Sequence, residues 1–216
     1  MTANVHIQRL GLTDYKSVLE EQRAIQARLI KGEECNTIII CRHKTVITLG
    51  RRAKESNILV SQDVLKKNKI DVIKIERGGD ITLHTPQQLM VYPLLNLDKI
   101  GHKNVHWYVD NIQKSVQDTL EELGMKSITF PDKPGVWISE RKKISSLGIR
   151  ISRWCTMHGF AINVLPSPEF NYIIPCGIKD IQMTSISEEL KKEIPFDIIE
   201  ELILKHFLHN MDLQAI

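Results

Sequence analysis

Several signals that would assign this chain to a common protein class are missing from it. Only four cysteines occur in 216 residues, with no C-x-x-C pair and no Cys/His spacing typical of a zinc site. So few cysteines in a chain of this length argue against a disulfide framework and favour reduced thiols. We therefore expect no metal site.

Long apolar runs and a strong net charge are also absent. No stretch approaches the roughly 18 apolar residues of a membrane-spanning helix. The start of the chain, MTANVHIQRLGLTDY, has neither an apolar signal core nor the Arg/Ser-rich character of a transit peptide. The net charge is +3, without the concentrated basic face of a nucleic-acid-binding protein. We expect a cytoplasmic protein that binds neither membrane nor nucleic acid.

What is present is an ordinary globular composition, 42% hydrophobic and 25% charged. No proline-, glycine- or serine-rich linker, internal repeat or low-complexity tract interrupts it. A chain of this length can bury a substantial core. A single domain over residues 1–216 is the expected organisation.

Hydrophobic periodicity predicts both strands and helices. Strands are expected at residues 5–9, 37–41, 45–50, 71–75, 89–97, 125–130, 135–138, 143–153 and 155–164, and helices at residues 15–31, 61–68, 104–123, 187–192 and 196–209. Residues 45–50 are expected to pair with residues 37–41, and Pro93 suggests an edge strand or a bulge. Because no strict βαβ repeat is seen, the pattern favours an α+β fold with a mixed, largely antiparallel sheet flanked by helices.

The most unusual segment follows the strand at residues 71–75. It reads RGGDITLHTPQQLMVYP over residues 77–93, and its double glycine lets the backbone bend sharply and approach a ligand closely. Arg77, Thr82 and His84 supply polar side chains at the bend. It matches neither G-x-x-x-x-G-K-[ST] nor G-x-G-x-x-G. A ligand-cradling loop and a plain hairpin turn are both compatible with this pattern.

The candidate chemistry lies between residues 143 and 176. Cys176 stands in Pro-Cys-Gly, so its thiol is expected on a rigid turn that another molecule can approach. A thiol attacks as its thiolate, which a nearby cation stabilises, and Lys143 is the candidate cation. From spacing alone, a buried structural cysteine and a surface lysine remain the commoner alternative.

Basic residues cluster at residues 42–44, 51–54 and 141–143. These charges are either solvated loop residues or a docking surface for an acidic partner, whose approach they would accelerate.

Six motifs in register resemble the lipoyl(octanoyl) transferase family. They are T-L-G-R at 48–51, R-G-G-x-x-T-x-H-x-P-x-Q-L at 77–89 with Tyr92-Pro93, P-G-V-W at 134–137, K-I-S-S-L-G-I-R at 143–150, H-G-F-A-I-N-V at 158–164, and P-C-G-I followed by T-S. Two departures concern the glycine segment, where Thr85 and Gln87 stand in place of the family's glycines, and Leu83 replaces its usual aromatic residue. They put the shape of this loop in question.

The resemblance implies a fold like the catalytic domain of biotin and lipoate protein ligases and an activity without a cofactor. Such enzymes carry octanoyl from acyl carrier protein to a lysine on lipoyl domains of 2-oxoacid dehydrogenases and on the glycine cleavage H protein. Carried over, Cys176 is the nucleophile and Lys143 its partner. The substrate site would be formed by Arg77, Gly78, Gly79, Asp80, Ile81, Thr82, Leu83, His84, Ser146, Leu147, Gly148, Gly159, Phe160 and Ala161.

Two alternatives stay open. An ATP-dependent lipoate or biotin protein ligase of the same fold would use a lysine like Lys143 on an acyl-adenylate and would not need Cys176. A non-catalytic module that binds an acyl group or its carrier would form no covalent adduct.

Overall fold

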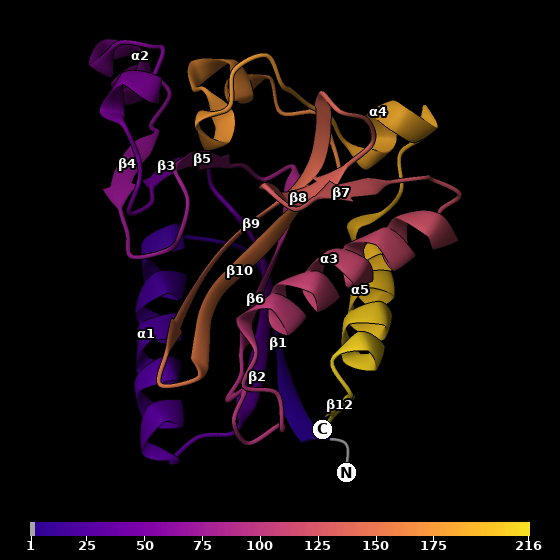
Figure 1. Cartoon of the computed structure of the whole chain (residues 1–216). Helices are drawn as coiled ribbons and strands as arrows, with labels where there is room; N and C mark the ends of the chain where they lie inside the picture. Colours follow the sequence, from indigo (N-terminus) through magenta and orange to yellow (C-terminus); the bar gives the residue numbers. More distant parts are fainter. Residues whose placement is uncertain (1–2) are drawn as a thin grey trace.

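The computed structural model describes residues 3–216 of the chain. A large mixed sheet forms its centre, with helices on both faces (Figure 1). Helix α1 (Tyr15–Lys31) covers one face, and α3 (Val105–Glu122) and α5 (Phe196–Asn210) cover the other. This is the α+β architecture with a largely antiparallel sheet that the periodicity predicts.

The large sheet has the strand order β12-β1-β2-β6-β10-β9-β8-β7, with β11 paired to β9. β1 runs parallel to β12 and β2, β11 runs parallel to β9, and the other pairs are antiparallel. Its strands are β1 (Ala3–Thr13), β2 (Asn36–His43), β6 (Gln88–Leu94), β7 (Ile128–Phe130), β8 (Lys133–Trp137), β9 (Lys142–Ser152), β10 (Cys155–Asn163), β11 (Gln182–Met183) and β12 (Leu213–Ala215).

A separate small sheet has the order β4-β3-β5, formed by β3 (Val46–Leu49), β4 (Asp71–Lys74) and β5 (Ile81–His84). The predicted pairing of residues 45–50 with residues 37–41 is therefore wrong. A short β-branched strand is compatible with either partner, and only the packing of Ile47 against Leu65 and Leu83 in the small core selects the second sheet.

Strand β6 lies in the middle of the large sheet, between β2 and β10, so the predicted edge position of Pro93 is wrong. Pro93 pairs with Ile38 of β2, whereas the registered pairing with β10 ends at Val91 and Phe160. Because proline has no N–H to donate, it is tolerated where one ladder is interrupted.

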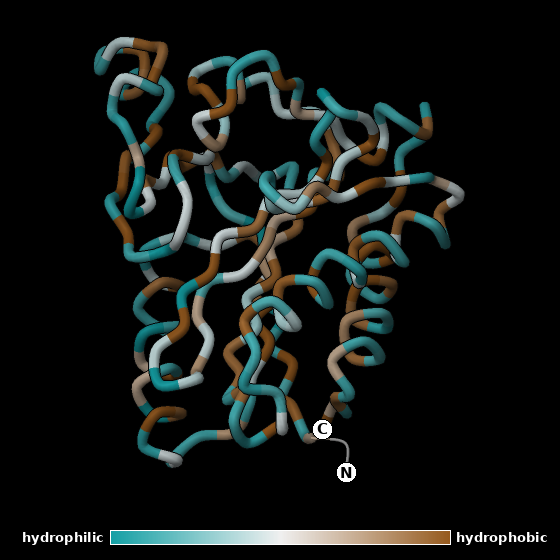
Figure 2. Tube along the Cα trace, in the orientation of Figure 1, coloured by the Kyte–Doolittle hydropathy of each residue, from teal (hydrophilic) through white to brown (hydrophobic). Residues whose placement is uncertain are grey.

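Helix α1 illustrates how local sequence sets an element. The side chain of Asp14 accepts hydrogen bonds from the backbone N–H groups of Lys16 and Ser17 at 2.9 and 3.2 Å, and Gly32 ends the helix in the left-handed conformation. Hydrophilic and hydrophobic residues alternate along the helix in Figure 2. The apolar stripe, which includes Val18 and Leu19, is buried against the sheet.

The other helices agree closely with the predicted ranges. α2 (Gln62–Lys67) is capped by Ser61, α3 by Asn104, and α4 (Ile186–Leu190) by Ser185. Strands β5, β11 and β12 are not predicted: β5 lies inside the glycine segment, which was interpreted as a loop or a hairpin turn, and β11 and β12 are only two and three residues long. No helix within residues 3–216 is both long and apolar enough to cross a bilayer.

Candidate active site

Cys176 lies on a short 3-10 turn, Pro175–Gly177, in the long connection between β10 and β11. Its backbone adopts φ 59° and ψ 11°, the left-handed region, which non-glycine residues seldom enter. Such strain is maintained only where the surrounding structure imposes it, and it concentrates at functional sites. The side chain is half-buried and reaches a cavity.

Neighbouring segments hold this turn in place. The backbone N–H of Ile174 donates to the carbonyl of Asn57 at 2.8 Å. The Asp80 carboxylate accepts a hydrogen bond from the Asn57 amide at 3.0 Å and occupies the space where a Cβ on Gly177 would lie. Gly177 also has a φ of 68°, so this position requires glycine twice over.

Lys143, on β9, approaches the thiol from the other side. Its ammonium lies 3.6 Å from the sulfur of Cys176, donates to the carbonyl of Pro134 at 2.8 Å and stands 4.7 Å from the centre of the Trp137 ring. The side chain is only 2% exposed. No carboxylate within residues 3–216 pairs with it, so the sulfur has no anionic competitor there.

The backbone around Lys143 explains how a buried lysine fits. Gly135 on β8 has a φ of 127°, and a Cβ there would lie 2.6 Å from Cε of Lys143 and 3.0 Å from Nζ. Beyond Cys176, Met183 of β11 pairs with Lys143, and the backbone N–H of Thr184 donates to the Lys143 carbonyl at 2.9 Å. The chain that follows the Cys176 turn is thus attached to the strand that carries the lysine.

A cavity of about 570 Å³ contains this pair, and it is lined by every predicted site residue except Leu83. Those residues are Arg77, Gly78, Gly79, Asp80, Ile81, Thr82, His84, Lys143, Ser146, Leu147, Gly148, Gly159, Phe160, Ala161 and Cys176. Leu83 is fully buried in the core of the small sheet. Thr82 and His84 reach the cavity while Leu83 points to the opposite face, because side chains alternate along a strand. Ile81 shares the face of Leu83 but also lines the cavity, at the start of β5 beside the glycine loop.

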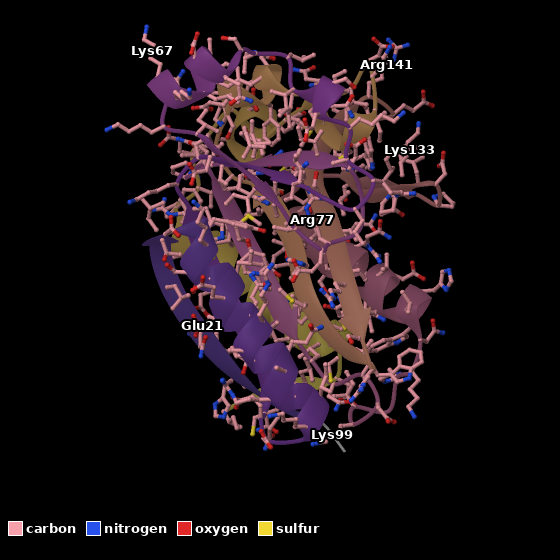
Figure 3. All side chains as sticks on the ribbon, turned by 90° about the vertical axis from the view of Figure 1, so that its left-hand side faces the viewer. Glu21, Lys67, Arg77, Lys99, Lys133 and Arg141 are labelled. Atoms are coloured by element: carbon pink, nitrogen blue, oxygen red, sulfur yellow. The ribbon has the colours of Figure 1, made fainter. Side chains whose placement is uncertain are left out.

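Arg77 is a buried guanidinium at the glycine loop (labelled near the middle of Figure 3). Its Nη2 donates to the carbonyl and hydroxyl of Thr48 at 2.7 and 3.0 Å, and Nη1 donates to the carbonyl of Gly78 at 3.0 Å. Burial lowers the pKa of Arg77, although arginine stays charged at neutral pH. No salt bridge to Arg77 forms within residues 3–216, which leaves its charge available to a polar ligand.

The glycine segment is not a plain hairpin. It connects β4 to β5, and both of these strands pair with β3 rather than with each other. The N–H of Gly78 donates to the carbonyl of Ile149 at 2.9 Å, which joins the loop to β9. The loop therefore forms one wall of the cavity, as the ligand-cradling interpretation requires.

Two buried histidines face the cavity beside Arg77. Burial lowers the pKa of His158 to about 4 and holds that of His84 well below its usual range, so both are neutral near pH 7. Both ring nitrogens of His158 and Nδ1 of His84 lack a hydrogen-bond partner within residues 3–216. The ring of His84 stacks on Tyr15, with centroids 5.5 Å apart. This end of the cavity is closed and aromatic, with polar atoms still to be satisfied.

Several lining residues were not among the predicted ones: Tyr15, Arg52, Met90, Tyr92, Val105, Val109, Asp132, Lys133, Pro134, Ile149, His158 and Ile178. Tyr92, Pro134 and His158 belong to motifs whose signal was already visible. Tyr15 begins α1 and Val109 lies within α3, and neither belongs to a motif, so only the tertiary structure reveals their position in the cavity wall.

Thr85 and Gln87, which stand in place of the two family glycines, make specific contacts. The hydroxyl of Thr85 lies 2.8 Å from that of Ser167 and accepts from the N–H of Gln87 at 3.3 Å, and the carbonyl of Gln87 accepts from Val164 and Leu165 at 3.1 Å. His84 nevertheless lines the cavity. The Thr85 side chain therefore ties the end of β5 to the loop that follows β10, whereas the Gln87 contacts use its backbone carbonyl, which a glycine would also provide.

The basic clusters divide between structural and exposed charges. Arg42 stands 4.4 Å from the centre of the Phe196 ring, Lys142 pairs with Glu189 at 3.0 Å, and Lys143 is buried in the site. Arg51 and Arg141 remain exposed, and Figure 3 shows Arg141 and Lys133 at the same side of the surface. Residues 3–216 contain no group of three or more His, Cys, Asp or Glu side chains that could hold a metal ion.

Comparisons with known proteins agree with this geometry. Residues 14–208 match the lipoyl protein ligase A/B catalytic domain. An octanoyltransferase of Christiangramia forsetii is 38% identical, with 96% of this chain and 95% of that protein aligned, and one of Flavobacterium johnsoniae is 34% identical, with both chains fully aligned.

Solved structures share the fold. A lipoate-protein ligase A bound with ATP superposes with a TM-score of 0.77 at 15% identity, covering 100% of this chain and 90% of the other. A biotin protein ligase from Aquifex aeolicus in complex with biotin and ATP gives 0.56 at 19% identity, covering 96% and 70%. The predicted family and fold class are confirmed. The chain therefore belongs to the lipoyl protein ligase A/B family, and its likeness to octanoyltransferases over nearly all its residues makes it an acyltransferase of that group.

Proposed function

We propose that this enzyme takes octanoyl from the thioester of an acyl carrier protein onto Cys176 and passes it to a lysine of a lipoyl domain. The observation that carries the proposal is the 3.6 Å contact between the sulfur of Cys176 and the ammonium of Lys143 beside the cavity. A thiolate is the attacking form of cysteine, and an adjacent ammonium stabilises it.

The reaction has two steps, acylation of Cys176 and transfer of the acyl group to the acceptor lysine. The Cys176 thiolate attacks the thioester carbonyl, the carbon–sulfur bond to the carrier breaks, and the carrier thiolate leaves and takes up a proton. The neutral amine of the acceptor lysine then attacks the new thioester, the bond to Cys176 breaks and returns the thiolate, and the amine proton passes to water or to the Lys143 amine, which gave its own proton to the carrier thiolate in the first step. Thiol–thioester exchange is nearly balanced and amide formation is downhill, so neither step requires ATP.

The charged intermediate of each step needs hydrogen-bond donors. Backbone N–H groups near Cys176 or in the glycine loop would stabilise the developing oxyanion. Arg77, a buried cation on the same cavity, adds positive potential. Acceptors of this chemistry would be the lipoyl domains of 2-oxoacid dehydrogenases and the glycine cleavage H protein.

The test is intact-protein mass spectrometry after incubation with octanoyl-carrier. We expect one octanoyl group on the wild type, mapped to Cys176, and its loss when a lipoyl domain is added. An unmodified wild type with carrier demonstrably bound contradicts the proposal. For carrier docking, Arg51→Glu and Arg141→Glu should raise KM and weaken the salt dependence of the rate.

An ATP-dependent ligase is the second candidate, because a ligase that binds ATP has the same fold. It predicts pyrophosphate release with free octanoate that survives Cys176→Ala. A protein that only binds the carrier would form neither the adduct nor pyrophosphate. The cysteine beside Lys143 favours the transferase, since adenylate chemistry needs no thiol.

A further inference from the structure

The cavity at Cys176 is lined from both faces of the large sheet. Tyr15, Met90 and Tyr92 belong to the apolar cluster on the α1 side, whereas Phe160 belongs to the cluster on the α3 side, and Val109 comes from α3 itself. Figure 1 shows α1 and α3 on opposite sides of the sheet. The cavity therefore passes around an edge.

That edge is the middle of β9. Registered pairing between β8 and β9 ends at Val136 and Ser145, so residues 146–149 have β10 on one side and, within residues 3–216, no paired strand on the other. Ser146, Leu147, Gly148 and Ile149 all line the cavity. Two lobes thus meet at this edge, close to Cys176 and Lys143.

The two lobes differ in exposure. The lobe on the α1 side ends at Tyr92, His84 and His158, which are all buried. The other lobe runs past Val109 to Val105, which is 42% exposed, and to the β7–β8 turn at Asp132 and Lys133. Binding of an acyl tail is most favourable where its apolar surface is removed from water, so we assign the tail to the closed lobe. The open lobe connects the reacting sulfur with solvent.

We propose that the open lobe binds the pantetheine arm of the acyl donor, an inference that rests on the proposed function. This arm carries methylene and gem-dimethyl groups, two neutral amides and a terminal phosphate. Val105, Val109 and Leu147 provide the apolar wall, and Asp132 and Lys133 of the β7–β8 turn make the mouth of the lobe polar. In the proposed reaction, the pantetheine arm is the part of the donor that must reach from the surface of the carrier to Cys176.

The charge at the mouth fits the phosphate end. Lys133 stands 5.5 Å from the centre of the Phe130 ring and pairs with no carboxylate among residues 3–216. Asp132 at the same turn carries the opposite charge, so Lys133 is the group of this turn that would attract a phosphate. The acceptor lysine, with four methylenes and no amide, needs neither the length nor the polar partners of this lobe.

The experiment compares thioesters with and without the arm. Acylation of Cys176 is followed by quenched mass spectrometry with octanoyl-4′-phosphopantetheine and with octanoyl-N-acetylcysteamine, which lacks most of the arm. Val109→Trp and Val105→Trp fill the lobe, and Ile128→Trp is the matched control, because Ile128 is 41% exposed on β7 and does not line the cavity. Using both filling variants guards against misfolding of one.

We expect the filling variants to reduce kcat/KM for the phosphopantetheine thioester about tenfold relative to the short thioester, because binding energy from the remote arm is lost. Ile128→Trp should leave the ratio unchanged. Lys133→Ala should lower kcat/KM for the phosphopantetheine thioester about threefold more than kcat/KM for octanoyl-pantetheine, which lacks the phosphate.

Equal losses with both thioesters, or no loss, would overturn the assignment. A changed preference between hexanoyl- and octanoyl-N-acetylcysteamine in Val109→Trp would also overturn it, because the lobe would then hold the acyl tail. If wild-type Cys176 is acylated by no thioester at all, the proposed function itself fails, which is a distinguishable result.

Discussion

Two cysteines of this protein have a basic side chain at almost the same distance, yet their surroundings differ. The sulfur of Cys41 on β2 lies 3.5 Å from Nε2 of His43, and that of Cys176 lies 3.6 Å from Nζ of Lys143. Burial raises the pKa of Cys41 and lowers the pKa of His43 to about 4. The first pair is therefore neutral at pH 7.

A base beside a cysteine stabilises the thiolate only when the base is charged, so the proposed function requires a difference in charge between the two bases. His43 and Lys143 are both almost completely buried. A lysine starts about four pH units above a histidine, so it tolerates far more desolvation before it loses its proton. Access differs as well, because Cys176 lines the cavity and Cys41 is sealed against Tyr15 and Tyr92.

The largest expected effect separates the two cysteines directly. Cys176→Ala should abolish acyl-enzyme formation and transfer, a loss of at least about 1000-fold, because no other nucleophile lines that turn. Cys41→Ala should retain transfer and lose on the order of 1 kcal/mol of unfolding free energy. Transfer assays and urea unfolding measure both, and an acyl adduct on Cys41 would break the comparison.

A smaller effect tests the charge of Lys143. Lys143→Met should slow iodoacetamide alkylation of Cys176 about 10- to 100-fold at pH 7 and move the midpoint of its pH curve upward, because the thiolate loses its cation. Lys142→Met is the matched control, since Lys142 pairs with Glu189. Gly135→Ala should act in the same direction by displacing Lys143. Superimposable pH curves for wild type and Lys143→Met would remove the lysine from this role.

Stability should depend on pH through the buried histidines. The folded pKa of about 4 for His43 and His158 lies below the ordinary 6.5, so between these values only the unfolded chain binds the protons. Stability is then fully present above pH 6.5 and falls by roughly 2 kcal/mol per histidine between pH 7 and pH 5.

Urea unfolding at the two pH values measures this loss. His158→Asn tolerates the φ of 60° at that position and should show a smaller difference between pH 7 and pH 5 than the wild type. An unchanged difference would show that His158 is not buried in its neutral form.

The smallest effect concerns the altered loop. Thr85→Gly removes the hydroxyl that contacts Ser167 and Gln87 and should cost about 1–2 kcal/mol of unfolding free energy. Thr85→Ser keeps the hydroxyl and should cost less than half as much. If Thr85→Gly is as stable as Thr85→Ser, the contact with Ser167 contributes nothing.

The sequence patterns predicted where helices and strands lie better than they predicted which strands pair with one another. The ranges of α1, α3, β9 and β10 follow from periodicity, because one buried face repeats over several turns or alternations. The partner of β3 and the central place of β6 do not follow from it, since a short apolar strand can be buried in either sheet. Leu83 was misplaced for a related reason: a motif does not state which face of its strand is functional.

The sequence by itself determined the candidate nucleophile and lysine, the polar loop residues and the family, because residue type and motif order are properties of the chain. Only the tertiary structure decided that residues 33 positions apart, Lys143 and Cys176, come within 3.6 Å. It also decided that Val109 faces a cavity rather than the core. The physical reason is that contacts across a sheet depend on which strands become neighbours, and the packing of the whole core selects among several arrangements that the local pattern permits equally.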